Sequence, residues 1–103
     1  MLQSVGQRRP VTDSGEDPRV SELLGAVARL RRELAGHPAE FPDRGIAEDE
    51  LAALHAMALG GAPEPARLRR SLLLVAGAIG SVSALAAALA AVREAVDRLS
   101  SSG

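Results

Sequence analysis

The sequence contains no cysteine, lysine, asparagine, tryptophan or tyrosine, and Phe41 is its only aromatic residue. Without cysteine the chain can form neither a disulfide scaffold nor a cysteine-based zinc site, and it has no thiol nucleophile. Residues that favour strands are scarce as well, with eight valines, two isoleucines and one threonine among 103 residues. This composition argues against β-sandwiches and barrels, so we expect a helical protein.

Alanine, leucine and arginine dominate what is present, at 20, 15 and 12 residues. Hydrophobic residues make up 47% and charged residues 24%, which is ordinary for a folded chain, and the length suits one small domain. The net charge is only -1, with an acidic middle at residues 37–61 between basic flanks. This distribution favours charge matching within the chain over a nucleic-acid or membrane partner.

The two ends of the chain lack helical periodicity. Residues 1–16 combine glycine, serine, proline and charged residues without a repeating pattern, which predicts a disordered N-terminal tail. They also lack the basic start and apolar core of a signal peptide, so we expect a cytoplasmic protein. The predicted helical domain covers residues 17–99, and residues 100–103 are expected to form a flexible C-terminal tail.

The first predicted helix begins at Asp17-Pro18, which read as an N-cap followed by proline at the first helical position. Gly36 is expected to end it as a left-handed C-terminal residue, with Pro38 as the stop. Between them, apolar residues recur at steps of three and four, as in an amphipathic helix: Val20, Leu23, Val27, Leu30 and Leu34.

Residues 36–45 carry two prolines and two glycines and are expected to form a loop. Phe41 within it is interpreted as a plug for the end of the helical core, with an anchor for a partner as the alternative. The second helix is expected to begin near Ile46 or Ala47 and to end before Gly60-Gly61. Its first turn would hold the acidic run 48–50, where negative charge suits the helix dipole.

The third predicted helix is long, from Pro65 to Leu99. Its apolar residues follow a heptad-like packing seam: Leu68, Leu72, Val75, Ile79, Val82, Leu89 and Val96. The sequence thus predicts an all-α antiparallel bundle of two short helices packed on one long C-terminal helix. Gly77 and Gly80 each cost about 1 kcal/mol relative to alanine. The sequence therefore leaves two alternatives to a straight helix: a kink at Gly77–Ser81, or a full break that allows the chain to close as a four-helix bundle.

Residues 72–92 form an uncharged run of 21 residues flanked by arginines, which makes a single-span inner-membrane protein the alternative. Only nine of the 21 are leucine, isoleucine or valine, and the glycines and serines oppose insertion. The first two predicted helices also have apolar faces that must be buried, and the third helix is the element of the chain that can cover them. We therefore expect the run to pack against its own chain.

Few residues in the sequence suggest a catalytic, metal-binding or interaction site. His37 and His55 have no metal-ligand spacing, and no serine lies in a nucleophile motif, so we expect no enzyme, no cofactor and no catalytic or metal-binding residue. Arg67, Arg69 and Arg70 are the candidate interaction residues, because cations near a helix N-terminus oppose its dipole. They could be balanced by the acidic run 48–50, by an acidic partner or by phosphates. Nucleic acid is disfavoured, since lysine and stacking aromatics are absent.

Two stretches, LRRELAGHPAEFPDRGIAEDELAAL at 30–54 and LRRSLLLVAGAIGSVSALA at 68–86, resemble a small actinobacterial (Streptomyces-type) family of unknown function. The resemblance covers nearly the whole chain but implies no catalytic or binding residues. We predict a helical protein that acts through protein–protein interaction, with itself as a homodimer or with another protein, and place the dimer contact on the third helix.

Overall fold

The computed structural model describes residues 17–38, 42–61 and 63–101. They form four α-helices, α1 (Pro18–Gly36), α2 (Arg44–Leu59), α3 (Pro65–Ile79) and α4 (Ala86–Ser101), with a short 3₁₀ helix, η2 (Ser83–Leu85), before α4. The disordered tail predicted for residues 1–16 and the interpretation of Phe41 as a plug lie outside the described residues, as do residues 102–103.

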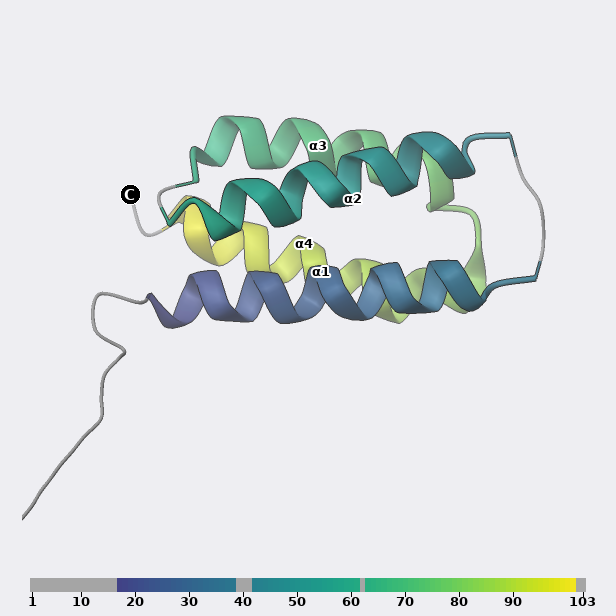
Figure 1. The fold of residues 1–103 in the computed structure, drawn as a ribbon, viewed down its shortest axis with the longest axis horizontal. Coiled ribbons are helices and arrows are strands. Elements are labelled where there is room, and N and C mark those ends of the chain that lie inside the picture. Colours follow the sequence, from purple (N-terminus) through teal and green to yellow (C-terminus); the bar gives the residue numbers. More distant parts are fainter. Residues whose placement is uncertain (1–16, 39–41, 62, 102–103) are drawn as a thin grey trace, which may run out of the picture.

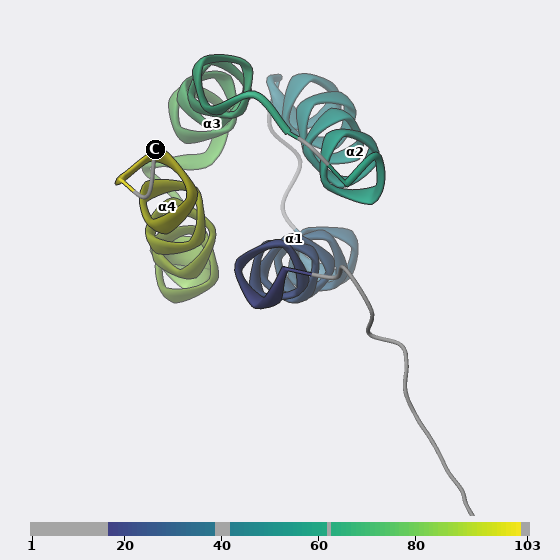
Figure 2. The ribbon, with the colours of Figure 1, turned by 90° about the vertical axis from the view of Figure 1, so that its left-hand side faces the viewer.

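The helices run alternately up and down and stand at the corners of a four-sided bundle (Figures 1 and 2). Each helix packs on its chain neighbours, and α4 closes the bundle against α1. Short connections between consecutive helices enforce this antiparallel order. The predicted all-α antiparallel bundle is confirmed.

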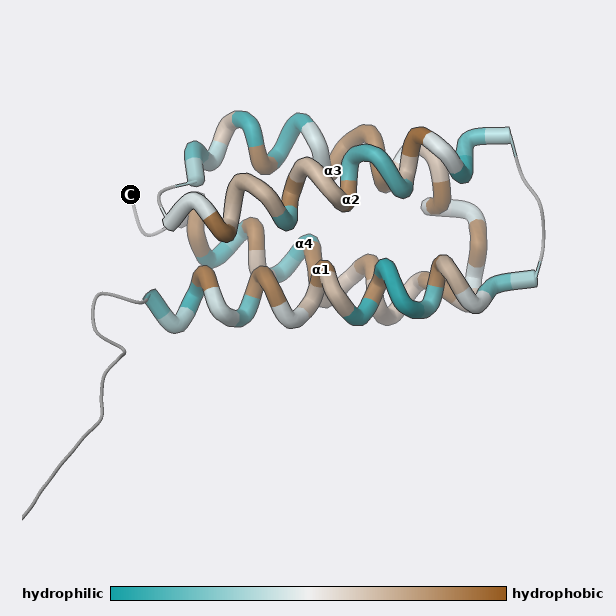
Figure 3. The backbone as a smooth tube through the Cα atoms, in the orientation of Figure 1, coloured by the Kyte–Doolittle hydropathy of each residue, from teal (hydrophilic) through white to brown (hydrophobic). Residues whose placement is uncertain are grey.

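The core is built from one apolar stripe on each helix (Figure 3). The stripe predicted for α1 is buried in full, and α2 adds Ala47, Leu51, Leu54 and Ala58. Leucine and valine from α3, η2 and α4 complete the interior. The uncharged run at residues 72–92 thus packs against α1 and α2, as expected. No helix among the described residues is both long and apolar enough to cross a membrane, and the single-span alternative is not favoured.

The long third helix is divided in two. α3 ends at Ile79, Gly80 caps it, and Val82 adopts an extended conformation before η2 and α4 turn back along the bundle. A continuous helix from 65 to 99 would measure about 52 Å, whereas the 19 residues of α1 and the 16 of α2 span about 28 and 24 Å. Reversal at Gly80 lets both halves of the apolar stripe face the same core, so the four-helix alternative is the one adopted.

Side chains form hydrogen bonds with the backbone groups at both ends of α1. The Asp17 carboxylate accepts a hydrogen bond from the backbone N–H of Arg19 at 2.9 Å, which confirms the predicted N-cap. At the other end of α1, the Arg44 guanidinium donates to the carbonyl oxygens of Leu34 and His37. Arg44 therefore ties the C-terminus of α1 to the first residue of α2 and fills the role that we expected of Gly36.

Three helix limits differ from expectation. α2 begins at Arg44, so the acidic run 48–50 lies in its second turn and not at the dipole's positive end. Gly36 is helical, and the positive φ in the described part of the chain belongs to Gly61, at 87°, where the α2–α3 turn requires it. α4 continues to Ser101, two residues beyond the expected limit at Leu99.

Candidate functional site

The three candidate arginines lie on the first two turns of α3 but point to different neighbours. The Arg69 guanidinium donates to the Ser100 hydroxyl of α4 at 2.8 Å. Arg67 and Arg70 instead line a hollow between α3 and α2. Within the part of the chain that the structure describes, neither of these two side chains makes a hydrogen bond or an ion pair. The cluster is therefore split between two sides of α3.

The hollow beside Arg67 and Arg70, which we call the α2–α3 groove, has a volume of about 280 Å³. Its lining combines apolar side chains with charges of both signs: Glu50, Ala53, Met57, Arg67, Arg70, Ser71 and Leu74. Leu74 is 43% exposed and Met57 is half-buried. Of the three acids expected to balance the arginines, the structure brings only Glu50 to them, without an ion pair among the described residues.

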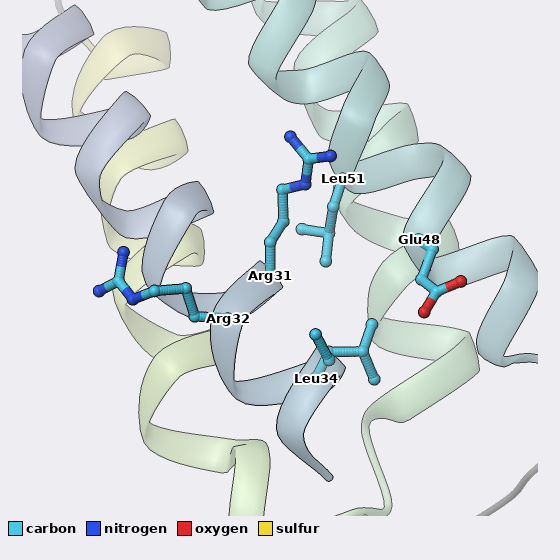
Figure 4. A pocket seen from close by; sticks show the side chains of 6 residues that line it. Arg31, Arg32, Leu34, Glu48 and Leu51 are labelled. Carbon is cyan, nitrogen blue, oxygen red and sulfur yellow. The ribbon is translucent and has the colours of Figure 1, made fainter.

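A second and larger hollow, the α1–α2 groove, has a volume of about 440 Å³ and is lined by Arg31, Arg32, Leu34, Ala35, Glu48 and Leu51 (Figure 4). The side chain of Arg31 extends beside Leu51, whereas that of Arg32 points away from α2. Glu48 is already engaged, since its carboxylate lies 3.4 Å from Nε of Arg44. Sequence reasoning missed this groove, although the ARLRR run at 28–32 repeats the one at 66–70.

The predicted packing seam is not exposed on the surface of the bundle. Six of its seven residues are buried in the core of the bundle, and Val82 is partly buried against it. The seam is occupied by α1 and α2 of the same chain, so a second copy cannot reach it without opening the bundle. Any contact with another molecule has to use the outer faces of the helices.

Neither histidine is among the residues that line the two grooves. His37 caps the end of α1, and His55 is half-buried on α2 with a buried Nδ1 that has no hydrogen-bond partner among the described residues. Among residues 17–38, 42–61 and 63–101, no three histidine, aspartate or glutamate side chains are grouped as a metal site would need.

Two ionisable groups among the described residues have a clearly shifted pKa, and they form one ion pair, Asp17 with Arg19. The Arg19 side chain and backbone donate hydrogen bonds to the Asp17 carboxylate, and they lower the pKa of Asp17 below 3.8. The same pairing raises the pKa of Arg19. Both side chains are partly exposed at the start of α1, where the pair stabilises the helix end.

The fold and its surface define a small antiparallel four-helix bundle whose outer faces carry two grooves with arginine in their lining. The chain belongs to the Family of unknown function (DUF5955), which it matches over residues 12–100. No curated protein and no solved structure matched the chain. The expected membership in a family of unknown function is confirmed, and that family assigns no activity.

Proposed function

We propose that the protein is a non-catalytic helical module that works by contact with another protein chain, and that the α2–α3 groove is its contact surface. The proposal rests on one observation. Leu74 is 43% exposed in a hollow that also presents Arg67 and Arg70, and neither arginine is paired within the described residues. Arginine and methionine, both of which line this groove, are enriched at protein interfaces.

The α1–α2 groove fits this role less well despite its larger volume. Its acid, Glu48, is held by Arg44, and its leucines, Leu34 and Leu51, are buried at 1% and 0% exposure. A partner would gain little apolar contact there. In the α2–α3 groove the apolar and charged groups are both still available to a second surface. Nucleic acid does not enter the proposal, because none of the described residues that line the α2–α3 groove is aromatic.

Site-specific photo-crosslinking in cells that express the protein tests the proposal. A photoreactive amino acid at position 74 is expected to give a discrete adduct with another polypeptide. Position 73 is the matched control. Leu73 is more exposed, at 72%, but it follows Arg69 by one helical turn and lies on the side of α3 that faces α4. No adduct at position 74, or the same adducts at both positions, would contradict the proposal.

The proposal also places the contact in the cytoplasm of an actinobacterium. The outer faces of the helices support an aqueous setting, because they carry exposed charges such as Arg31, Asp49, Arg70 and Glu94. The lineage is supported by the resemblance of residues 30–54 and 68–86. Recovery of the protein from the membrane pellet of lysed cells after carbonate extraction would contradict this location.

A further inference from the structure

We infer that the α2–α3 groove binds an amphipathic helix of another protein, acidic in its first two turns and apolar in the turns that follow. This inference rests on the proposed role of the groove as a contact surface and specifies the partner. The argument is the distribution of charge and apolar surface along the groove, which is basic at one end and apolar at the other.

The basic end of the groove lies beside the turn between α2 and α3. With a rise of about 1.5 Å per residue from Pro65, Arg67 lies about 3 Å and Arg70 about 8 Å along α3. Both are exposed, and they line the groove together. Glu64, the exposed residue before α3, forms no ion pair with either arginine in the described part of the chain. Two guanidinium groups are therefore available to carboxylates of a partner.

The apolar end of the groove lies farther from the turn. Leu74 is about 14 Å along α3 and is 43% exposed. Ile46 precedes Glu50 of the groove by one helical turn, so it continues the same face of α2, about 20 Å from the turn. Ile46 is 47% exposed. A partner that covers these two side chains removes apolar surface from water.

The walls of the groove explain why the partner segment is a helix. Both walls are α-helices, whose backbone N–H and C=O groups are bonded within each helix and are not available to a partner. A segment that lies in the groove therefore has to satisfy its own backbone groups, and an α-helix does so. From Arg67 to Ile46 the groove face extends about 17 Å, which corresponds to about eleven residues of a partner helix.

The intervals along the groove define the partner's side-chain pattern. Measured from Arg67, Arg70 lies about 5 Å away, Leu74 about 10 Å and Ile46 about 17 Å. The matching positions of a partner helix are acids at i and i+4 and apolar residues at i+7 and i+11, which share one face. Carboxylates in its first turns also stabilise the partner helix through its dipole. The partner therefore runs from the turn towards Ile46.

Glu50 keeps the partner's acids at the basic end. It lies about 14 Å from the turn, at the same level as Leu74 on the opposite wall. A carboxylate of the partner at that level would meet a like charge, whereas an apolar residue there covers Leu74. Acids are thus attracted at one end of the groove and repelled at the other.

A synthetic peptide tests the inference on the folded protein. The probe is an alanine-rich helix of about 18 residues, with glutamate at i and i+4 and leucine at i+7 and i+11. Met57 lines the groove and is one of two methionines, so labelling of the methionine methyl groups with ¹³C gives a simple spectrum that Met57→Leu assigns. We expect the peptide to shift the Met57 signal in a saturable way.

Two control peptides of the same length test the pattern. One carries lysine in place of both glutamates. The other carries its leucines at i+9 and i+13, on the opposite face of the helix from the acids. We expect each to bind at least about tenfold more weakly than the probe, because the first meets like charge and the second leaves the apolar end of the groove uncovered.

Variants of the protein test which residues the peptide contacts. The double reversal Arg67→Glu with Arg70→Glu should weaken binding of the glutamate peptide at least about tenfold and should restore binding of the lysine peptide. Restoration by a matched reversal requires direct contact between the two charged pairs. Arg69→Glu reverses a charge on the side of α3 that faces Ser100, and it should leave the affinity unchanged.

The exposed leucines of α3 give a second matched pair. Leu74→Ser should weaken binding of the glutamate peptide, whereas Leu73→Ser, at the more exposed neighbour, should not. Circular dichroism checks that each variant keeps its helical content and unfolding temperature. Equal losses at positions 73 and 74 would contradict the assignment of the contact to the groove.

The inference and the proposed function fail by different results. If the glutamate peptide does not shift Met57 up to about 1 mM, or if the lysine peptide binds as tightly, the acidic helix as partner is wrong. A photo-adduct at position 74 on a segment without the acidic and apolar pattern would then leave the groove as the contact surface for another kind of partner. If no adduct forms at position 74 in cells, the proposed function fails whatever the peptide does.

Discussion

Alanine at Gly80 and alanine at Gly77 should have opposite effects on stability. Both glycines interrupt the same apolar run, three residues apart, and a helix-propensity scale treats them alike. The structure treats them differently. Gly77 is exposed inside α3 and an added Cβ meets nothing within 4 Å, whereas a Cβ on Gly80 would lie 2.3 Å from the carbonyl oxygen of Ala76.

The magnitudes follow from these surroundings. Gly77→Ala should raise the free energy of unfolding by about 1 kcal/mol, because the unfolded chain loses freedom and the helix loses nothing. At Gly80 the contact is with backbone, which cannot rotate away, so the turn itself has to move. Overpacking of this kind costs about 1–3 kcal/mol. The two variants should therefore differ by about 2–4 kcal/mol.

Thermal and urea unfolding followed by circular dichroism measures this difference. For a domain of this size, 1 kcal/mol corresponds to about 4–8 °C in Tm. We expect Gly77→Ala to melt above the unmodified protein and Gly80→Ala below it. If Gly80→Ala were stabilised as much as Gly77→Ala, the helix would have to continue through residue 80, and the reversal of the chain at that point would be wrong.

Three further predictions concern the helix ends. Gly61→Ala should lower the free energy of unfolding in urea by about 1–2 kcal/mol, because an L-residue is strained at a φ of 87°. A gain in stability would contradict the left-handed conformation of Gly61 in the α2–α3 turn. Arg44→Ala should cost about 1–2 kcal/mol because the last carbonyl groups of α1 lose their charged donor, while Glu48→Ala, which removes only an exposed ion-pair partner, should cost under about 1 kcal/mol. Equal costs would show that the capping contacts contribute nothing. Asp17→Asn tests the lowered pKa of Asp17: the folded-state pKa lies below the unfolded value, so the contribution of the charged group is complete above about pH 4 and is lost as the pH falls through the lowered pKa. Melting curves in acid should therefore show the unmodified protein losing its advantage over the variant, and a difference independent of pH would contradict the Asp17–Arg19 pairing.

The core of the bundle was largely predictable, because amphipathic spacing is a local property of each segment. The stripe from Val20 to Leu34 is buried as predicted, and so is most of the seam from Leu68 to Val96. The N-cap at Asp17 needs only its own side chain and the next turn, and it was predicted too. What spacing could not show is which molecule covers the seam, since the same pattern fits a dimer, a membrane and a bundle.

The candidate site was predictable only in part. Arg67 and Arg70 could be singled out because cations are unusual at a helix N-terminus. Their separation from Arg69 could not, because it depends on α2 lying on one side of α3 and α4 on the other. Leu74 gave no signal at all. In the sequence it is one more apolar residue of a long run, and its exposure follows from the rotation of α3 within the bundle.

The amino-acid order alone determined that this chain is helical, where its apolar stripes lie and how α1 begins, because turns of helix and their caps involve residues within four positions of each other. The tertiary structure decided that the chain reverses at Gly80, that Arg44 caps a helix other than its own, and that Glu50 shares a groove with Arg67. These contacts join residues distant in sequence, and they become favourable only when four apolar faces close around one core.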